Sequence, residues 1–221
     1  MPSLNTKNIK NKKLCEFSSI TNTQLNILMS AEYMFGHKGI NSTSTRDINI
    51  HSKEKNASSV SYHFGNKENL IDFILAYRIS ELEIIRMKEY DKLLKKINNP
   101  SKKDLIKLIL RPIINKISKD PLWKNFIPFY EQVIVFNESQ IIQNKYMNVI
   151  NNYAKGTLEI YKRLKSIHEG KTANISDKKR HDFLCFFICS LSHTKKTKPQ
   201  IINNKNYIDY LEKISLDILL S

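Results

Sequence analysis

The sequence predicts an all-α fold, and three observations support this prediction. Glycine and proline together account for only 11 of the 221 residues, which leaves few of the turns that many short strands would need. Apolar residues recur with the 3.6-residue helical period in one segment after another, and no segment shows the alternation of a half-buried strand. Residues that favour helix N-termini stand just before several of these segments.

The composition excludes several classes of protein. A hydrophobic fraction of 41% with 26% charged residues is typical of a soluble globular protein. No window approaches the roughly 18 consecutive apolar residues of a membrane span, and the N-terminus lacks the apolar core of a signal peptide, so we expect a cytoplasmic protein. The formal charge of +15 favours a polyanionic partner, although an AT-rich coding sequence would also produce part of this Lys excess.

Residues 1–66 divide into an arm and three short helical segments. Residues 1–20 are rich in Lys, Asn and Ser, so we expect a disordered basic arm, which is either a solvated tail or a minor-groove contact. Residues 21–66 form what we call the head. Its first helix begins at Thr21 and ends before Gly39, a second covers 44–50 with Ser42 and Thr43 as candidate caps, and a third covers 57–63. The apolar stripe of the first helix consists of Ile27, Leu28, Ala31 and Phe35.

The remainder, 67–221, predicts a larger helical domain. Asn66 caps a long helix from Lys67 to about Ile97, and we expect four or five further helices in an antiparallel bundle. Their expected ranges are 102–117, 122–136, 139–167, 177–193 and 207–220.

The stretch from Ile27 to Leu70 resembles the N-terminal domain of TetR-family repressors. The resemblance rests on the runs Thr43-Ser44-Thr45-Arg46-Asp47-Ile48 and Tyr62-His63-Phe64-Gly65-Asn66-Lys67-Glu68-Asn69-Leu70. A weaker likeness to TetR C-terminal domains lies in 110–113, 123–136 and 183–193. The resemblance implies a helix-turn-helix DNA-binding domain followed by an effector-binding and dimerisation domain. It further implies a homodimeric transcriptional regulator, expected to be a repressor, that a small-molecule effector releases from its double-stranded DNA operator.

The candidate DNA-binding residues follow from this motif. The second helix of a helix-turn-helix lies in the major groove, where hydroxyls and amides can read base edges. Here that role falls to Asn56, Ser58, Ser59 and Ser61. The hydroxyls and free N–H groups at the start of the preceding helix suit phosphate oxygens, which gives Thr43, Ser44, Thr45 and Arg46. The family pattern adds Tyr62, His63 and Lys67. Lys67 is the expected phosphate clamp, whereas Tyr62 and His63 are alternatively packing residues.

One departure from the family pattern lies in the turn between the second and third segments. Family members have a glycine there, but residues 49–56 contain none, and Ile48 and Val60 are one residue further apart than usual. The turn must therefore be longer. It fits either an altered operator or the alternative function, a helical small-molecule sensor or interaction protein whose degenerate head binds DNA weakly.

A TetR-like protein senses its ligand in a cavity among the helices that follow the head. Aromatic residues that would suit a flat or apolar small molecule concentrate in the matching region. They are Trp123, Phe126, Phe129, Tyr130, Phe136, Tyr146 and Tyr153. Their alternative interpretation is packed core, because aromatic residues at helical spacing are usually buried. The long helix from Lys67 would be the lever between cavity and head.

No motif indicates an enzyme, a cofactor or a metal site. The sequence has no Gly-rich phosphate loop, no nucleophile elbow and no paired carboxylates of a di-iron bundle. A four-residue repeat, formed by His181, Cys185, Cys189 and His193, could offer two ligands to a metal, but one helix cannot complete a tetrahedral site. Packing of these residues at a dimer seam is the preferred interpretation. The apolar surfaces of 177–193 and 207–220 predict the homodimer interface.

Overall fold

The computed structural model describes residues 20–54, 56, 58–135, 140–169 and 175–221, and within these ranges it contains ten α-helices, two short 3-10 helices and no strand. The expected basic arm, residues 1–20, lies outside the described residues except for Ile20. No described helix is long and apolar enough to cross a membrane.

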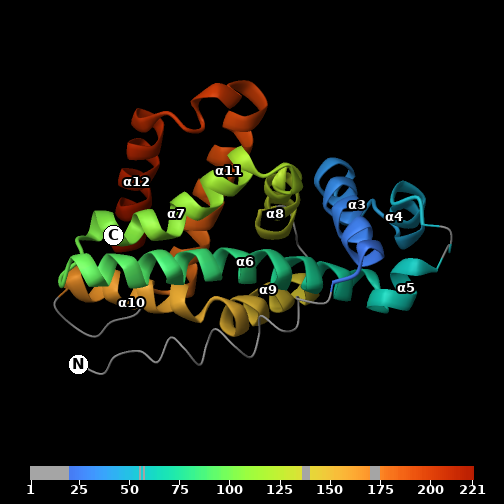
Figure 1. The fold of residues 1–221 in the computed structure, drawn as a ribbon, viewed down its shortest axis with the longest axis horizontal. Helices are drawn as coiled ribbons and strands as arrows, with labels where there is room; N and C mark the ends of the chain where they lie inside the picture. The colour runs from blue at the N-terminus through green and yellow to red at the C-terminus, as the bar shows by residue number, and fades with distance from the viewer. Residues whose placement is uncertain (1–19, 55, 57, 136–139, 170–174) are drawn as a thin grey trace.

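The head consists of α3 (Asn22–Lys38), α4 (Thr45–His51) and α5 (Ser59–Phe64), which lie together at one end of the molecule (Figure 1). A capping box at Thr21 begins α3, and Gly39 ends it with a φ of +85° and a ψ of 153°. The positive φ favours glycine, but the conformation is extended and is not the left-handed helical cap that the sequence predicts. Helix α4 is capped by Ser44 and not by Ser42 or Thr43, because Asp47 lies three residues after Ser44 and completes a capping box. The fully buried core of the head includes Ile27, Leu28, Phe35, Ile48 and Val60.

Helix α6 (Lys67–Lys96) runs along most of the molecule and connects the head to the larger domain (Figure 1). The side chain of Asn66 accepts a hydrogen bond from the Asn69 N–H and so begins the helix as predicted. Three residues in its first two turns, Leu70, Ile71 and Ile74, are fully buried, and α5 packs against the same helix.

The larger domain surrounds the rest of α6. Its helices are α7 (Lys102–Lys119), the 3-10 turn η1 (Pro121–Trp123), α8 (Phe126–Ile134), α9 (Gln140–Tyr153), α10 (Lys155–Glu169), α11 (Asp177–Thr197), the 3-10 turn η2 (Pro199–Ile201) and α12 (Lys205–Leu220). Figure 1 shows α9 and α10 along one side of α6 and α7 along the other, with α11 and α12 beyond α7. Because the expected helix 139–167 is divided in two, six helices follow Pro100 in the described residues, not four or five.

The division at Ala154 has a tertiary cause. The carboxylate of Glu83, a residue of α6, accepts hydrogen bonds from the Gly156 N–H, the Thr157 N–H and the Thr157 hydroxyl. These are groups that a helix N-terminus leaves unsatisfied, so a side chain from another helix caps α10. The expected helix 122–136 also begins later, because Pro121 opens a 3-10 turn and α8 starts only at Phe126.

The head and the larger domain meet at a tightly packed contact between α3 and α8, which we call the junction. Gly36 of α3 lies so close to α8 that an added Cβ would stand 2.7 Å from the Cβ of Pro128. Helix α6 also contacts α3 near the junction, where Arg78 of α6 forms two hydrogen bonds of 2.7 and 2.8 Å with the carboxylate of Glu32. Its guanidinium also donates to the Leu122 carbonyl and lies 4.8 Å from the ring centre of Trp123.

Candidate functional site

Helix α5 carries a polar, solvent-exposed surface. Ser58, Ser61 and Tyr62 are exposed, and Tyr62 retains 80% of its accessible surface. The Asn56 side chain is also exposed and accepts a hydrogen bond from the Ser58 N–H at 2.9 Å. Ser59, in contrast, is buried and donates its hydroxyl to the Asn56 carbonyl, while the half-buried ring of His63 meets Tyr62 edge-on. The serine pattern therefore contains both surface residues and a residue that shapes the turn.

The N-terminus of α4 is already partly satisfied within the head. Ser44 donates its hydroxyl to the Asp47 carboxylate and accepts from the Asp47 N–H. These hydrogen bonds hold the pKa of Asp47 below its usual value. Thr43 is buried, and its hydroxyl donates to the Gly39 carbonyl at 2.8 Å. Arg46 is exposed and Thr45 half-buried, so both side chains reach the surface of the head.

The turn between α4 and α5 forms without the glycine of the family pattern. Lys53 takes the left-handed conformation instead, with a φ of +57°, and no other described non-glycine residue has a positive φ. Asn49 of α4 spans the turn, because its side-chain oxygen accepts from the Val60 N–H at 3.0 Å. This hydrogen bond satisfies a free donor in the first turn of α5 and sets the two helices against one another. Residues 55 and 57 lie outside the described part of the turn.

Lys67 lies partly inside the head. Its ammonium group donates to the carbonyls of Ile40 and Thr43, at 3.1 and 3.2 Å. It therefore ties the start of α6 to the segment that connects α3 with α4. An ammonium group has three donor hydrogens, and these two contacts occupy two of them.

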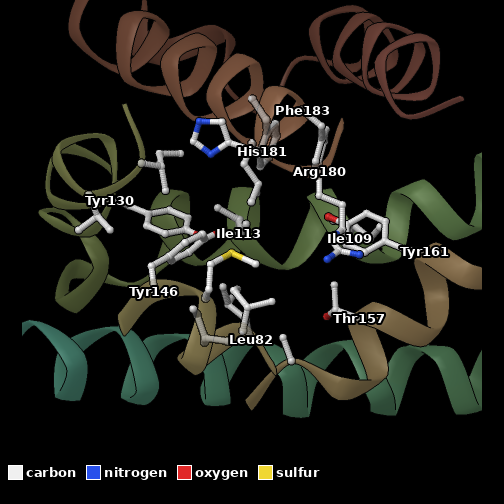
Figure 2. A pocket seen from close by; sticks show the side chains of 18 of the residues that line it. Leu82, Ile109, Ile113, Tyr130, Tyr146, Thr157, Tyr161, Arg180, His181 and Phe183 are labelled. Atoms are coloured by element: carbon white, nitrogen blue, oxygen red, sulfur yellow. The ribbon is translucent and has the colours of Figure 1, made fainter. Parts of the chain in front are cut away.

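A cavity of about 530 Å³ lies in the larger domain, between α6, α7, α8, α9, α10 and α11. Figure 2 shows Tyr130 and Tyr146 at one end of it and Thr157 and Tyr161 at the other, with Arg180 and His181 reaching in from α11. The hydroxyls of Tyr130 and Tyr146 lie 3.1 Å apart and share a hydrogen bond. Most other side chains of the wall are aliphatic or aromatic, among them Leu82, Ile109, Ile113 and Phe183.

The aromatic residues proposed from the sequence divide into two groups. Phe126, Tyr130 and Tyr146 line the cavity, whereas Trp123, Phe129 and Tyr153 do not. Trp123 belongs to the junction, and Phe129 points from α8 toward α3, with its ring centre 6.0 Å from that of Phe35. Phe136 lies outside the described residues.

Sequence reasoning missed several polar groups of the cavity, which include Arg86, Thr157, Tyr161, Asp177, Lys178, Arg180 and His181. Arg86 had a detectable signal, since it follows Ile79 and Leu82 along one face of α6 where apolar residues are expected. Burial raises the pKa of Tyr130 to about 12 and also raises those of Tyr146 and Tyr161. The three phenols are therefore protonated hydrogen-bond donors at neutral pH.

The repeat on α11 forms one local pair. The thiol of Cys185 lies 3.3 Å from Nε2 of His181, and burial raises the pKa of this thiol above its ordinary value. Cys189 is half-buried and His193 exposed. Within the described residues, no three His, Cys, Asp or Glu side chains gather closely enough to hold a metal ion.

Comparison with known proteins supports the fold through structure alone. No family model and no curated protein matches the sequence. A solved structure of a putative TetR-family transcription regulator from Shewanella sp. PV-4 matches 90% of this chain and 97% of its own, with 13% sequence identity and a TM-score of 0.59. HlyIIR, a hemolysin II transcriptional regulator, is 21% identical over 90% of this chain and 97% of its own, with a TM-score of 0.47. The all-α fold predicted from the sequence is confirmed, and it is the fold of a TetR-type regulator.

Proposed function

We propose that the protein is a sequence-specific DNA-binding transcriptional regulator whose operator binding is controlled by a small molecule in the cavity. The observation that carries the proposal is the double role of α6. Leu70 and Ile74 in its first turns are fully buried beside the head, and Ile79, Leu82 and Arg86 further along line the cavity. Any ligand that moves α6 therefore acts on the head.

The proposed DNA-binding surface is the exposed part of the head. The side chains proposed to meet base edges in the major groove are Asn56, Ser58 and Ser61, which lie at or just before α5, and the exposed Tyr62 is a proposed phosphate contact. Ser44, Thr45 and Arg46 are proposed phosphate contacts at α4, and Lys67 and His63 complete the surface. Thr43 and Ser59 support this surface from inside, since both hydroxyls are committed to backbone carbonyls.

The proposed regulation is release of the operator by the effector. Two heads of a dimer can enter successive major grooves only at a spacing of about 34 Å, so a small pivot of each head changes the affinity. A ligand that prefers the wider arrangement shifts the population by its differential affinity, with a coupling of about 1 to 3 kcal/mol. DNA must weaken the binding of that ligand by the same factor.

The homodimer is proposed to form through α11 and α12. Both helices carry apolar side chains that the chain itself covers only in part, including Phe186, Cys189, Leu216 and Tyr210, of which Tyr210 is 51% exposed. A second copy would cover them in a four-helix contact. A stable monomer in sedimentation at micromolar concentration would contradict this interface.

DNA binding is tested by selecting bound fragments from a random double-stranded library. The selected site should bind with an affinity that falls linearly with salt on a logarithmic scale. Arg46→Ala should lower both the affinity and the salt slope. Lys162→Ala also removes one positive charge, but at an exposed position of α10, and should alter neither. Failure to enrich any sequence would overturn the proposal.

A second candidate function is a small-molecule sensor whose head has lost specific DNA binding. The charge distribution favours this candidate, because the head holds four basic and three acidic residues and is not where the +15 charge concentrates. The glycine-free turn is consistent with it as well. Such a protein would bind a cavity ligand while the DNA selection enriched nothing.

A further inference from the structure

Arg86 is a buried cation that forms no direct ion pair with any described residue. Its side chain lies on α6 in the cavity wall, and the residue is only 5% exposed. It donates to two neutral oxygens, the Thr157 hydroxyl at 3.3 Å and the Ile109 carbonyl at 3.2 Å. Its Nε has no hydrogen-bond partner among the described residues, and none of the ion pairs between described residues includes Arg86. A buried charge left in this state is costly unless an anion completes it.

The nearest acidic residue along the helix is already committed. Glu83 lies one turn before Arg86, and its carboxylate accepts three hydrogen bonds from the beginning of α10. Thr157 connects the two side chains, because its hydroxyl donates to Glu83 and accepts from Arg86. Arg86 is thereby held in place at the cavity wall.

The other charged groups of the wall leave the cavity cationic. Its described lining contains one acidic residue, Asp177, and this carboxylate pairs with Arg180. Lys178 and His181 add further basic groups to the same wall. Both Arg86 and Arg180 lie near the Tyr161 phenol, since their positive charges oppose the rise in its pKa that burial causes. Arg86 and Arg180 therefore lie toward the Thr157 and Tyr161 end of the cavity, whereas Figure 2 shows His181 nearer Tyr130.

The remaining wall determines the rest of the ligand. A volume of about 530 Å³ lined by aliphatic and aromatic side chains fits a small organic molecule with a hydrophobic body. One of the paired hydroxyls of Tyr130 and Tyr146 donates its hydrogen to the other. The accepting hydroxyl still has its own hydrogen and can donate it to an acceptor on the ligand.

We infer that the cavity binds an organic carboxylate: a monoanion on an aromatic or hydrocarbon body, whose carboxylate pairs with the Arg86 guanidinium at the Thr157 end. This inference names the ligand class of the site in the proposed function and rests on that proposal for its regulatory meaning. An apolar molecule without the anion would leave the buried Arg86 guanidinium without a direct counter-ion and should bind more weakly.

Matched pairs of probes test the charge requirement. Calorimetric titration of the full chain at pH 7 would compare 2-naphthoate with 2-naphthamide, 4-phenylbutyrate with 4-phenylbutyramide, and decanoate with decanamide. At least one carboxylate should bind about tenfold to a hundredfold more tightly than its own amide, as expected for a charge-assisted hydrogen bond in a buried site. Equal binding within every pair, or no binding of any carboxylate, overturns the inference.

Variants then assign the preference to a residue. Arg86→Met should abolish the difference between acid and amide, while Arg86→Lys, which keeps the charge, should retain part of it. Lys162→Met at the exposed face of α10 is the matched control and should behave as the parent protein. An Arg86→Met variant that unfolds at the parent temperature yet still prefers the acid contradicts the inference. DNA selection is a separate readout, so a carboxylate preference without DNA binding would refute the proposed function and leave this inference standing.

Discussion

Arg78 and Arg86 lie about two turns apart on α6, and their exposed fractions are only 1% and 5%, yet their surroundings differ. Arg78 meets a carboxylate supplied by the head, a carbonyl and an aromatic ring. Arg86 meets two neutral oxygens and borders the cavity of about 530 Å³. The difference teaches that burial alone does not reveal the role of a charge. An arginine with its counter-ion inside the chain stabilises the fold, whereas one without a counter-ion is available to a ligand.

The largest expected effect is that of Arg78→Met. It leaves the Glu32 carboxylate fully buried without a cation, so the free energy of unfolding should fall by about 3 to 5 kcal/mol. Arg86→Met should change it by at most about 1 kcal/mol, because no described carboxylate depends directly on that guanidinium. Urea unfolding at one protein concentration measures both, and the double variant Glu32→Met with Arg78→Met should recover most of the loss. Equal losses for the two arginines would remove the distinction drawn above.

An alkaline titration examines the cavity side of the comparison. Burial raises the pKa of Tyr130 from 10 to about 12, so the stability that this phenol contributes is complete below pH 10 and is lost as the pH rises through 12. The full loss corresponds to about 3 kcal/mol. The nearby Arg86 charge lowers this pKa, so Arg86→Met should move the loss to still higher pH. The free energy of unfolding is measured against pH for the parent protein and for Tyr130→Phe, which lacks the ionising group. Identical alkaline profiles for the two proteins would show that folding does not raise the pKa of Tyr130.

Single added carbons test whether the two regions differ in free space. Gly36→Ala places a methyl group 2.7 Å from the Cβ of Pro128 and 3.0 Å from the Phe129 nitrogen, and should cost about 1 to 3 kcal/mol. Val133→Ile adds one carbon at the cavity wall, where space exists, and should change stability by less than about 0.5 kcal/mol. Thermal unfolding of both variants provides the measurement. A larger loss at Val133 than at Gly36 would reverse the assignment of packed junction and open cavity.

A small effect of opposite sign is expected in the head, and it provides a reference for the others. Lys53→Gly relieves a left-handed backbone at a residue with a φ of +57° and should raise stability by about 0.5 to 1 kcal/mol. It touches neither arginine, so the carboxylate preference of the cavity should stay unchanged. A loss of stability would mean that the Lys53 side chain contributes more than its backbone costs.

Local signals explain how much of the fold the sequence predicted. Asn66 begins α6 as expected, and Ser101 caps α7 at the predicted start of the range 102–117, because a capping side chain bonds to the backbone two or three residues away. The break at Ala154 escaped prediction for the opposite reason. It depends on Glu83, which lies more than 70 residues earlier in the chain. Helix patterns contain no information about such a partner until the fold brings it there.

The candidate sites show the same limit. The pattern predicted an aromatic region, and Phe126 and Tyr130, four residues apart on α8, do face the cavity. Phe129 lies on the other side of the same helix and packs on Phe35, which a stricter use of helical spacing would have shown. The exposed residues of α5 were proposed from family likeness, and their contacts with DNA stay a prediction. Arg86 could have been noticed as a charged residue on an apolar face, but only the structure shows that it forms no direct ion pair with a described residue.

The shared helix α6 also restricts how such a chain could exchange its parts during evolution. A crossover at residue 66 would transfer the head without Leu70, Ile71 and Ile74, and would leave Glu32 without the cation that neutralises it. A transplanted head would need the host to supply those side chains together with the Pro128 surface on which Gly36 rests. The head and the cavity-bearing domain should therefore be inherited together, and a chimaera should fold only when its boundary lies well inside α6.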